Sequence, residues 1–233
     1  MIKAVIFDFD HTLYDRNATY DGMFPILKEL LAPYLNRALS DEELLARFKQ
    51  ADKDGAYPRG WPDVYECCVK GGIFDTVPDY QTYMKAIRTA HPVSITLFSD
   101  TVSTLNILKD MKIRLGMLTN GGSQSQRDKL ENVPEILPLF DKIMIGGDLP
   151  KEKPHAEAYH AICHELNIAP DEAIYVGDHP TNDVEGSKLA GLTAIWIPYV
   201  RPFPTGVTPP DFTIEALREI PDIINKLNNG ANQ

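Results

Sequence analysis

Residues 4–10 of the chain read Ala4-Val5-Ile6-Phe7-Asp8-Phe9-Asp10. The first four side chains are apolar without alternation, which is typical of a strand covered on both faces of a parallel sheet. Shorter or similar apolar runs recur later in the chain, at Leu115–Leu118, Ile143–Ile145, Ala173–Val176 and Thr193–Ile197. We therefore expect several buried parallel strands.

Helical patterns separate these later runs or flank them, at Asp100–Met111, Gln124–Leu130, Ala156–Leu166, Asp183–Ala190 and Ile214–Leu227. Strands that alternate with helices of this length form right-handed βαβ units. The pattern predicts an α/β fold with a doubly wound parallel sheet.

The stretch from Asp15 to His91 breaks this alternation and contains no convincing buried strand. Its helical patterns cover Gly22–Tyr34, Asp41–Ala51, Pro62–Lys70 and Tyr80–Ala90. Ser40 and Glu43 have the spacing of a capping box, which favours a helix start there. We expect an α/β core of residues 1–14 and 92–233, with a smaller all-helical domain of residues 15–91 inserted after the first strand.

Composition limits the possible partners. The chain has 233 residues and a formal net charge of −10, and it lacks a Lys/Arg-rich run, which argues against nucleic acid as a partner. Its hydrophobic fraction of 43% is that of a globular protein. No apolar run approaches the roughly 18 residues of a membrane span, and no leader pattern precedes the first strand. We expect a cytoplasmic protein without a membrane partner; the sequence does not indicate its oligomeric state.

Polar side chains follow the predicted strands at their carboxyl ends, where open α/β sheets bind ligands. After the first strand, Asp8 and Asp10 lie on one side with Cα atoms about 6–7 Å apart, and carboxylates this close repel unless a cation or a proton intervenes. Alternatively, Asp8 caps backbone amides and Asp10 starts a turn. Thr119 and Asn120 follow another strand and offer a hydroxyl and amides to a phosphate, or form a simple turn.

Two further strand ends carry charged residues. We expect Pro154 at the first position of the following helix, which leaves Lys153 near the N-cap, where a cation opposes the helix dipole. A local rule broken in this way indicates a functional site, although a solvated lysine is the alternative. Gly177 permits a sharp turn, Asp178 lies at the strand end, and Asp183 begins a helix as an N-cap or a metal-facing carboxylate.

Together these groups indicate a site that binds a divalent cation beside a phosphate. Clustered carboxylates beside a phosphate-sized anion favour a hard divalent cation, and Mg²⁺ typically binds few carboxylates, several waters and a phosphate oxygen. His160 and His164 are four residues apart but have no third ligand, which favours a surface or core-edge pair over a zinc site. The expected cofactor is Mg²⁺.

On these residues the sequence resembles the haloacid dehalogenase superfamily of hydrolases. The family's four motifs have matches in chain order: Asp8, Asp10 and Thr12; Thr119; Lys153 with Pro154; and Gly177, Asp178 and Asp183. The resemblance spans the whole chain, and the helical insert is similar to the family's helical (C1-type) cap. His11 departs from the glycine that is common in the first motif, so its side chain is expected to narrow the mouth of the site or touch the leaving group.

The resemblance implies a Mg²⁺-dependent phosphatase that acts on a small phosphorylated metabolite. Asp8 would attack phosphorus and form an aspartyl-phosphate, and Asp10 would protonate the departing alkoxide and then activate water. The other implied roles are metal binding by Asp8, the Asp10 backbone carbonyl, Asp178 and Asp183, and balancing of phosphoryl charge by Thr119, Asn120 and Lys153.

Competing hypotheses remain. Asp10 favours a phosphatase over a haloacid dehalogenase, because carbon–halogen hydrolysis produces no alkoxide to protonate. A non-catalytic phosphate sensor or interaction module on the same fold is the second hypothesis, although it needs no acid/base at Asp10. The helical insert is expected to recognise the leaving group, through side chains that otherwise form a solvated surface: Arg47, Lys49, Lys53, Arg59 and Trp61, with Tyr14 and Arg16 at the hinge.

Overall fold

The computed structural model describes residues 1–55, 60–199 and 202–230. The chain divides into two compact units, a core unit (Met1–Asp15 and Leu97–Gln233) and a helical unit (Arg16–Thr96). The helical unit ends at Thr96 rather than at the expected His91. Residues 92–96 are joined to the helical unit by two hydrogen bonds: the Ser94 hydroxyl donates to the Ala90 carbonyl at 2.8 Å, and the Thr96 N–H donates to Thr19 Oγ1 of α1 (Arg16–Leu30) at 3.2 Å.

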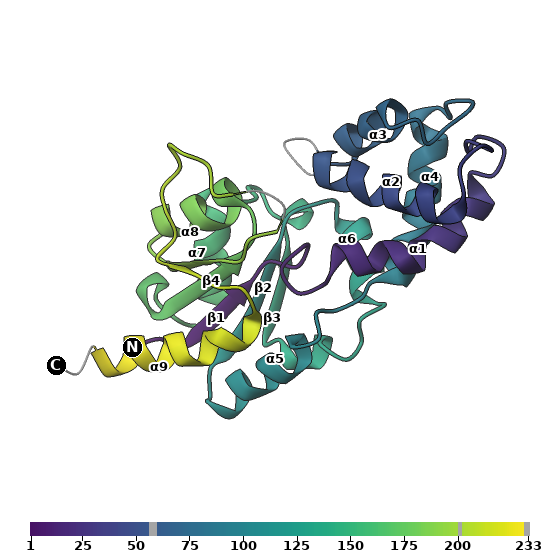
Figure 1. Ribbon diagram of the computed structural model, residues 1–233. Coiled ribbons are helices and arrows are strands. Elements are labelled where there is room, and N and C mark those ends of the chain that lie inside the picture. Colours follow the sequence, from purple (N-terminus) through teal and green to yellow (C-terminus); the bar gives the residue numbers. More distant parts are fainter. Residues whose placement is uncertain (56–59, 200–201, 231–233) are drawn as a thin grey trace. The chain divides into compact units, whose positions relative to one another are not determined.

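Among the described residues, the core unit contains a six-stranded parallel sheet in the order β3-β2-β1-β4-β5-β6 (Figure 1). Its strands are β1 (Ala4–Phe7), β2 (Arg114–Thr119), β3 (Lys142–Ile145), β4 (Ala173–Gly177), β5 (Thr193–Trp196) and β6 (Phe212–Thr213). The central strand β1 pairs with β2 and β4, and all four of its side chains are fully buried. The parallel sheet predicted from the apolar runs is therefore confirmed.

Helices cover both faces of this sheet. They are α5 (Thr101–Asp110), α6 (Ser123–Leu130), α7 (Ala156–Glu165), α8 (Gly186–Leu189) and α9 (Ile220–Gly230). Figure 1 shows α7 and α8 on one face and α5 with α9 on the other, as a doubly wound fold requires. None of the helices in the described ranges has the length and hydropathy needed to cross a lipid bilayer.

Two predicted helices are wrong in their extent. Instead of one helix over Ile214–Leu227, Ile214 continues the pairing of the short strand β6 with β5, a 3-10 turn covers Leu217–Glu219, and α9 begins only at Ile220. Instead of a helix over Asp183–Ala190, a π-helical turn, η5 (Pro180–Glu185), precedes the short α8. Both differences come from hydrogen bonds with distant or side-chain partners, which leave no periodic signal in the sequence.

The helical unit consists of α1 (Arg16–Leu30), α2 (Asp41–Gly55), α3 (Trp61–Lys70) and α4 (Tyr80–Ala90) within the described residues. Helix α1 begins and ends earlier than predicted and continues through Pro25. Burial of Tyr20, Met23 and Leu27 on one face offsets the roughly 3 kcal/mol that an internal proline costs. The predicted capping box at Ser40 is present: its hydroxyl accepts from the Glu43 N–H at 3.2 Å, and its own N–H donates to Glu43 Oε2 at 2.8 Å.

Several insert side chains named above have partners inside the helical unit. Arg47 donates to a backbone carbonyl at 2.7 Å, and Lys49 pairs with an aspartate at 2.6 Å. Trp61 packs against the guanidinium of Arg16, 4.3 Å from the ring centroid. Arg59 lies outside the described residues. Recognition of a leaving group by these side chains stays a prediction.

Candidate functional site

Three carboxylates gather at the carboxyl ends of the central strands. Asp8 follows β1, Asp178 follows β4, and Asp183 lies in the turn η5. All three side chains are buried, and each offers an oxygen within 4.8 Å of the oxygens of the other two. The position of Gly177 explains part of this convergence, because a Cβ there would lie 2.4 Å from Asp183 Cγ. Only glycine lets β4 approach the Asp183 carboxylate so closely.

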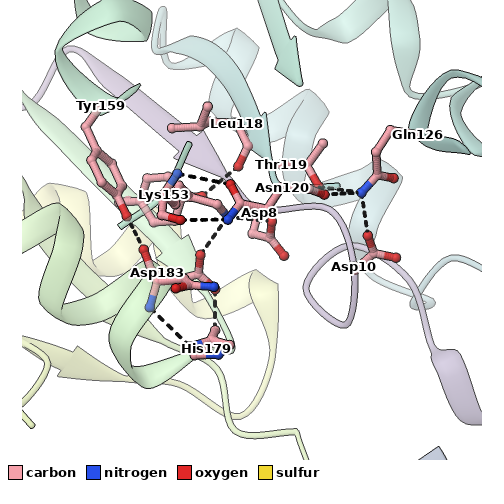
Figure 2. A network of polar contacts seen from close by, with 12 residues as sticks. Asp8, Asp10, Leu118, Thr119, Asn120, Gln126, Lys153, Tyr159, His179 and Asp183 are labelled. Atoms are coloured by element: carbon pink, nitrogen blue, oxygen red, sulfur yellow. Dashed lines mark hydrogen bonds and ion pairs between the residues drawn. The ribbon is translucent and has the colours of Figure 1, made fainter. Parts of the chain in front are cut away.

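Lys153 connects two of these acids (Figure 2). Its Nζ lies 2.7 Å from Asp8 Oδ1, 2.7 Å from Asp183 Oδ1 and 2.7 Å from the Tyr175 hydroxyl. The Tyr175 hydroxyl in turn donates to the Leu118 carbonyl at 2.7 Å. The ammonium group therefore has a definite position between two strand ends.

The predicted placement of Pro154 at the first position of a helix, with Lys153 near the N-cap, is wrong. Helix α7 begins at Ala156 with His155 as its N-cap, and Lys153 and Pro154 precede it in a loop, joined by a cis peptide bond. Asn120, the residue after β2, fixes this loop: its side-chain amide donates to the Lys153 carbonyl at 2.8 Å, and its Oδ1 accepts from the Lys153 N–H at 3.1 Å. The lysine reaches the site through contacts with the sheet and not through a helix terminus.

Charge and burial determine the protonation states of Lys153 and Asp8. Burial opposes the charge of Lys153, but the carboxylates of Asp183 and Asp8 outweigh it and raise its pKa, so the ammonium stays charged. Burial raises the pKa of Asp8 to about 7, although Lys153 acts in the opposite direction. Three buried carboxylates beside one ammonium leave excess negative charge, which favours binding of a cation.

The carboxylate of Asp10 is not part of this cluster and lies apart from it. Lys129 Nζ is 2.5 Å from Asp10 Oδ1, Gln126 Nε2 donates to Oδ2 at 2.8 Å, and the Tyr14 hydroxyl donates to Oδ1. Burial opposes ionisation of Asp10, but Lys129 outweighs it and lowers the pKa of the carboxyl group well below its usual range. The expectation that Asp10 contributes to metal binding therefore rests on its backbone carbonyl alone.

Sequence reasoning overlooked Gln126, Lys129 and Tyr175. The first two are three residues apart in α6, the helix that follows Thr119, and this spacing places them on one helix face. A search for polar residues one turn apart after the second motif would have found them. Tyr175 lies within an apolar strand pattern and has no such signal.

Thr119 and the loops around the site are also held by specific contacts. Thr119 is buried, and its Oγ1 accepts from Gln126 Nε2 at 3.0 Å.

His11 has φ of 61°, a left-handed conformation that explains why glycine is common at this position, and its ring lies 4.0 Å from that of Tyr199. The His179 ring accepts from two amides of η5, and its burial lowers its pKa, so it acts as a neutral cap.

The donor set fits a hard divalent cation. Asp8, Asp178 and Asp183 offer carboxylate oxygens, the ligands that Mg²⁺ prefers, and the grouping contains no histidine or cysteine that would favour a softer metal. His160 Nε2 instead lies 3.0 Å from the Ala190 carbonyl, as expected of a structural histidine.

Comparison with known proteins identifies the family. The model of the haloacid dehalogenase-like hydrolases matches residues 5–197. The chain is 28% identical to the glyceraldehyde 3-phosphate phosphatase of Methanopyrus kandleri, over 97% of this chain and 99% of that protein. It is also 28% identical to the human N-acylneuraminate-9-phosphatase, over 97% of this chain and 95% of that protein. A Bacillus subtilis HAD hydrolase described as bound to magnesium has the same fold, with a TM-score of 0.71 and 22% identity over 96% of this chain and 99% of its own.

The order of the strands, the buried acids at their carboxyl ends and this family match agree with one another. The chain belongs to the haloacid dehalogenase-like hydrolase family, and the two relatives named above, which it matches over almost its whole length, are phosphatases.

Proposed function

We propose that the chain is a Mg²⁺-dependent phosphatase of small phosphorylated metabolites and that it works through an aspartyl-phosphate on Asp8. The observation that carries the proposal is the convergence of the Asp8, Asp178 and Asp183 carboxylates, with the ammonium of Lys153 2.7 Å from two of them. A phosphate sensor needs no acid/base such as Asp10, so the intact set of groups favours an enzyme.

The metal site would be formed by Asp8, Asp178 and Asp183, together with the backbone carbonyl of Asp10. When bound, Mg²⁺ would screen the negative charge that separates an anionic nucleophile from a phosphoryl group. In a phosphoryl transfer of this kind most of the rate enhancement comes from positioning and charge stabilisation.

Asp8 supplies the nucleophile. One of its carboxylate oxygens forms a bond to phosphorus as the bond from phosphorus to the leaving oxygen breaks, which gives the aspartyl-phosphate and an alkoxide. Lys153 keeps the carboxylate in place, because its Nζ donates to Asp8 Oδ1. Thr119 and Lys153 would bind the oxygens of the transferred phosphoryl group and balance their charge.

Asp10 serves both half-reactions. It gives a proton to the departing alkoxide and then takes one from the water that attacks the aspartyl-phosphate, which releases phosphate and restores Asp8. The ionised carboxylate described above is the form required for the second step. The negative charge of an arriving substrate favours the uptake of a proton by a neighbouring carboxylate, and so prepares Asp10 for the first step.

A panel of phosphorylated metabolites assayed with Mg²⁺ tests this proposal and ranks the substrates by kcat/KM. We expect turnover by the wild type, loss of turnover in Asp8→Asn, and trapping of ³²P on the wild-type protein but not on Asp8→Asn. Asp10→Asn should lose about 100-fold or more in kcat on alkyl phosphates. Binding of phosphate esters without turnover of any of them would favour the sensor hypothesis instead.

A further inference from the structure

Asp10 has partners of its own, separate from the carboxylate cluster. Lys129 Nζ lies 2.5 Å from Oδ1 and 2.6 Å from Oδ2 of Asp10, and Gln126 Nε2 donates to Oδ2 at 2.8 Å. The Tyr14 hydroxyl donates to Oδ1. The Lys129 side chain is only 7% exposed, and Gln126 is buried. Both oxygens of the Asp10 carboxylate are therefore held in one orientation by donors largely shielded from water.

Gln126 connects Asp10 to the end of β2. Its Nε2 also lies 3.0 Å from Thr119 Oγ1 and 2.5 Å from the Asn120 carbonyl (Figure 2). The Asp10 carboxylate oxygen and the Asn120 carbonyl accept hydrogen bonds and donate none, so the amide must present its nitrogen to them. This orientation leaves Gln126 Oε1 buried without a hydrogen-bond partner among the described residues, at a cost of about 1–3 kcal/mol. The two N–H groups of the amide thereby join the Asp10 carboxylate to the end of β2.

We propose that Lys129 and Gln126 are positioning residues, which hold the Asp10 carboxylate where it can transfer a proton to the leaving group and keep it out of the metal site. This inference rests on the proposed function. Asp10 is only two residues from Asp8, so a carboxylate free to rotate there would be attracted to the same divalent cation. Lys129 supplies a competing cation of fixed position. A carboxylate bound to the metal could not take part in proton transfer. The contacts of Lys129 and Gln126 from helix α6 keep Asp10 from binding the metal in this way.

The test compares two leaving groups. p-Nitrophenyl phosphate releases a stable anion that needs little protonation, whereas an alkyl ester such as glycerol 2-phosphate depends on the acid. Hydrolysis of the aspartyl-phosphate is common to both esters, so the rate compared is that of the first half-reaction, measured in a single turnover as release of the alcohol or of p-nitrophenolate. With saturating Mg²⁺, Lys129→Met should lose about 100-fold in this rate on the alkyl ester, the loss expected when a reacting group is displaced by about 1 Å. It should lose under about 5-fold on p-nitrophenyl phosphate, where the acid contributes least. KM should change little for either ester.

Three further variants make this result specific. Gln126→Leu should show the same dependence on the leaving group, with a smaller loss. Lys129→Arg should recover about tenfold or more of the lost rate of the first half-reaction on the alkyl ester, because it restores the ion pair. Arg127→Met is the matched control: it removes an exposed ion pair with Asp148 from the same helix and should leave both rates unchanged.

A double-mutant comparison covers the case in which Lys129→Met fails to fold because it leaves the charge of the Asp10 carboxylate without its countercharge. Asp10→Asn and Asp10→Asn/Lys129→Met both lack that unpaired charge, and their kcat values should agree within about threefold if Lys129 acts through Asp10. A further tenfold loss in the double variant would overturn the inference. So would equal losses on the two esters in Lys129→Met. A wild type inactive toward every ester with Mg²⁺ would instead refute the proposed function.

Discussion

Substitution of Gly177 by alanine would disturb the carboxylate cluster by a single methyl group. A Cβ at this last residue of β4 would lie 2.4 Å from both Cγ and Oδ2 of Asp183. Ordinary contact begins at 3.4 Å, so the Asp183 carboxylate would have to retreat by about 1 Å. It is held by Lys153 Nζ at 2.7 Å and by the His179 N–H at 2.8 Å, and such a retreat would take both contacts beyond hydrogen-bond distance.

The expected magnitudes follow from this geometry. Overpacking costs about 1–3 kcal/mol, and for a chain of this size each kcal/mol lowers Tm by about 2–4 °C. Mg²⁺ requires ligands at about 2.0–2.1 Å in near-ideal geometry, so a carboxylate displaced by that amount is lost as a ligand or as a partner of bound water. We expect Mg²⁺ affinity to fall about 10–100-fold, as when a group supporting a metal site is removed.

Calorimetric titration of Mg²⁺ and thermal unfolding with and without Mg²⁺ measure both effects. The control is Gly122→Ala, because Gly122 has φ of −66° and a Cβ there would have no atom within 4 Å. Gly122→Ala should keep the wild-type Mg²⁺ affinity. If Gly177→Ala also retained wild-type affinity and Tm, Asp183 would not be packed against β4 as described, and the reasoning would be refuted.

Two other substitutions, one in each unit, test how charged side chains contribute to stability. Arg16→Met should destabilise the protein by about 3–5 kcal/mol in urea denaturation, because it leaves the buried Asp52, now 2.8 Å from the guanidinium, without that countercharge; an unchanged urea midpoint would show that the pair contributes nothing. In the core unit, partial burial opposes the ionisation of Asp141, but the Leu115 N–H and Lys109 outweigh it and lower its pKa. A lowered carboxyl pKa contributes stability above the unfolded pKa, near 4, and this contribution disappears as the pH falls through the folded pKa. Asp141→Asn should therefore lower the free energy of unfolding by under about 1 kcal/mol at pH 7, since the site is partly exposed. The variant and the wild type should be equally stable at a pH low enough to protonate Asp141 in both the folded and the unfolded state. A difference in stability that persisted at that pH would contradict a lowered pKa of Asp141.

The strand pattern was predictable because parallel strands buried on both faces must be apolar throughout, and this requirement acts on each segment separately. Ala4–Phe7 and Ala173–Val176 show it clearly, and both are strands in the structure. The helix start after Ser40 was predictable for a similar reason, since a capping box joins residues only three positions apart. The strand β6 was not, because two residues gain strand geometry only from the neighbour with which they pair.

In the candidate site, too, some features were predictable from the sequence and others depend on the folded structure. Which residues lie at the carboxyl ends of the strands, among them Asp8, Thr119 and Asp178, is a property of the sequence once the strands are known. Where Lys153 points depends on the sheet, because its Nζ lies between groups that are 145 and 30 residues away in the chain.

By itself, the amino-acid sequence determined the fold class, the chemical groups at the strand ends and the family they indicate, because each depends on local periodicity or on short motifs. Only the tertiary structure decided how those groups pair: that Lys153 joins Asp8 and not a helix terminus, and that Asp10 turns to Lys129, 119 residues along the chain. Pairing of this kind depends on the free energy of burying opposite charges together, and that free energy exists only after distant segments have met.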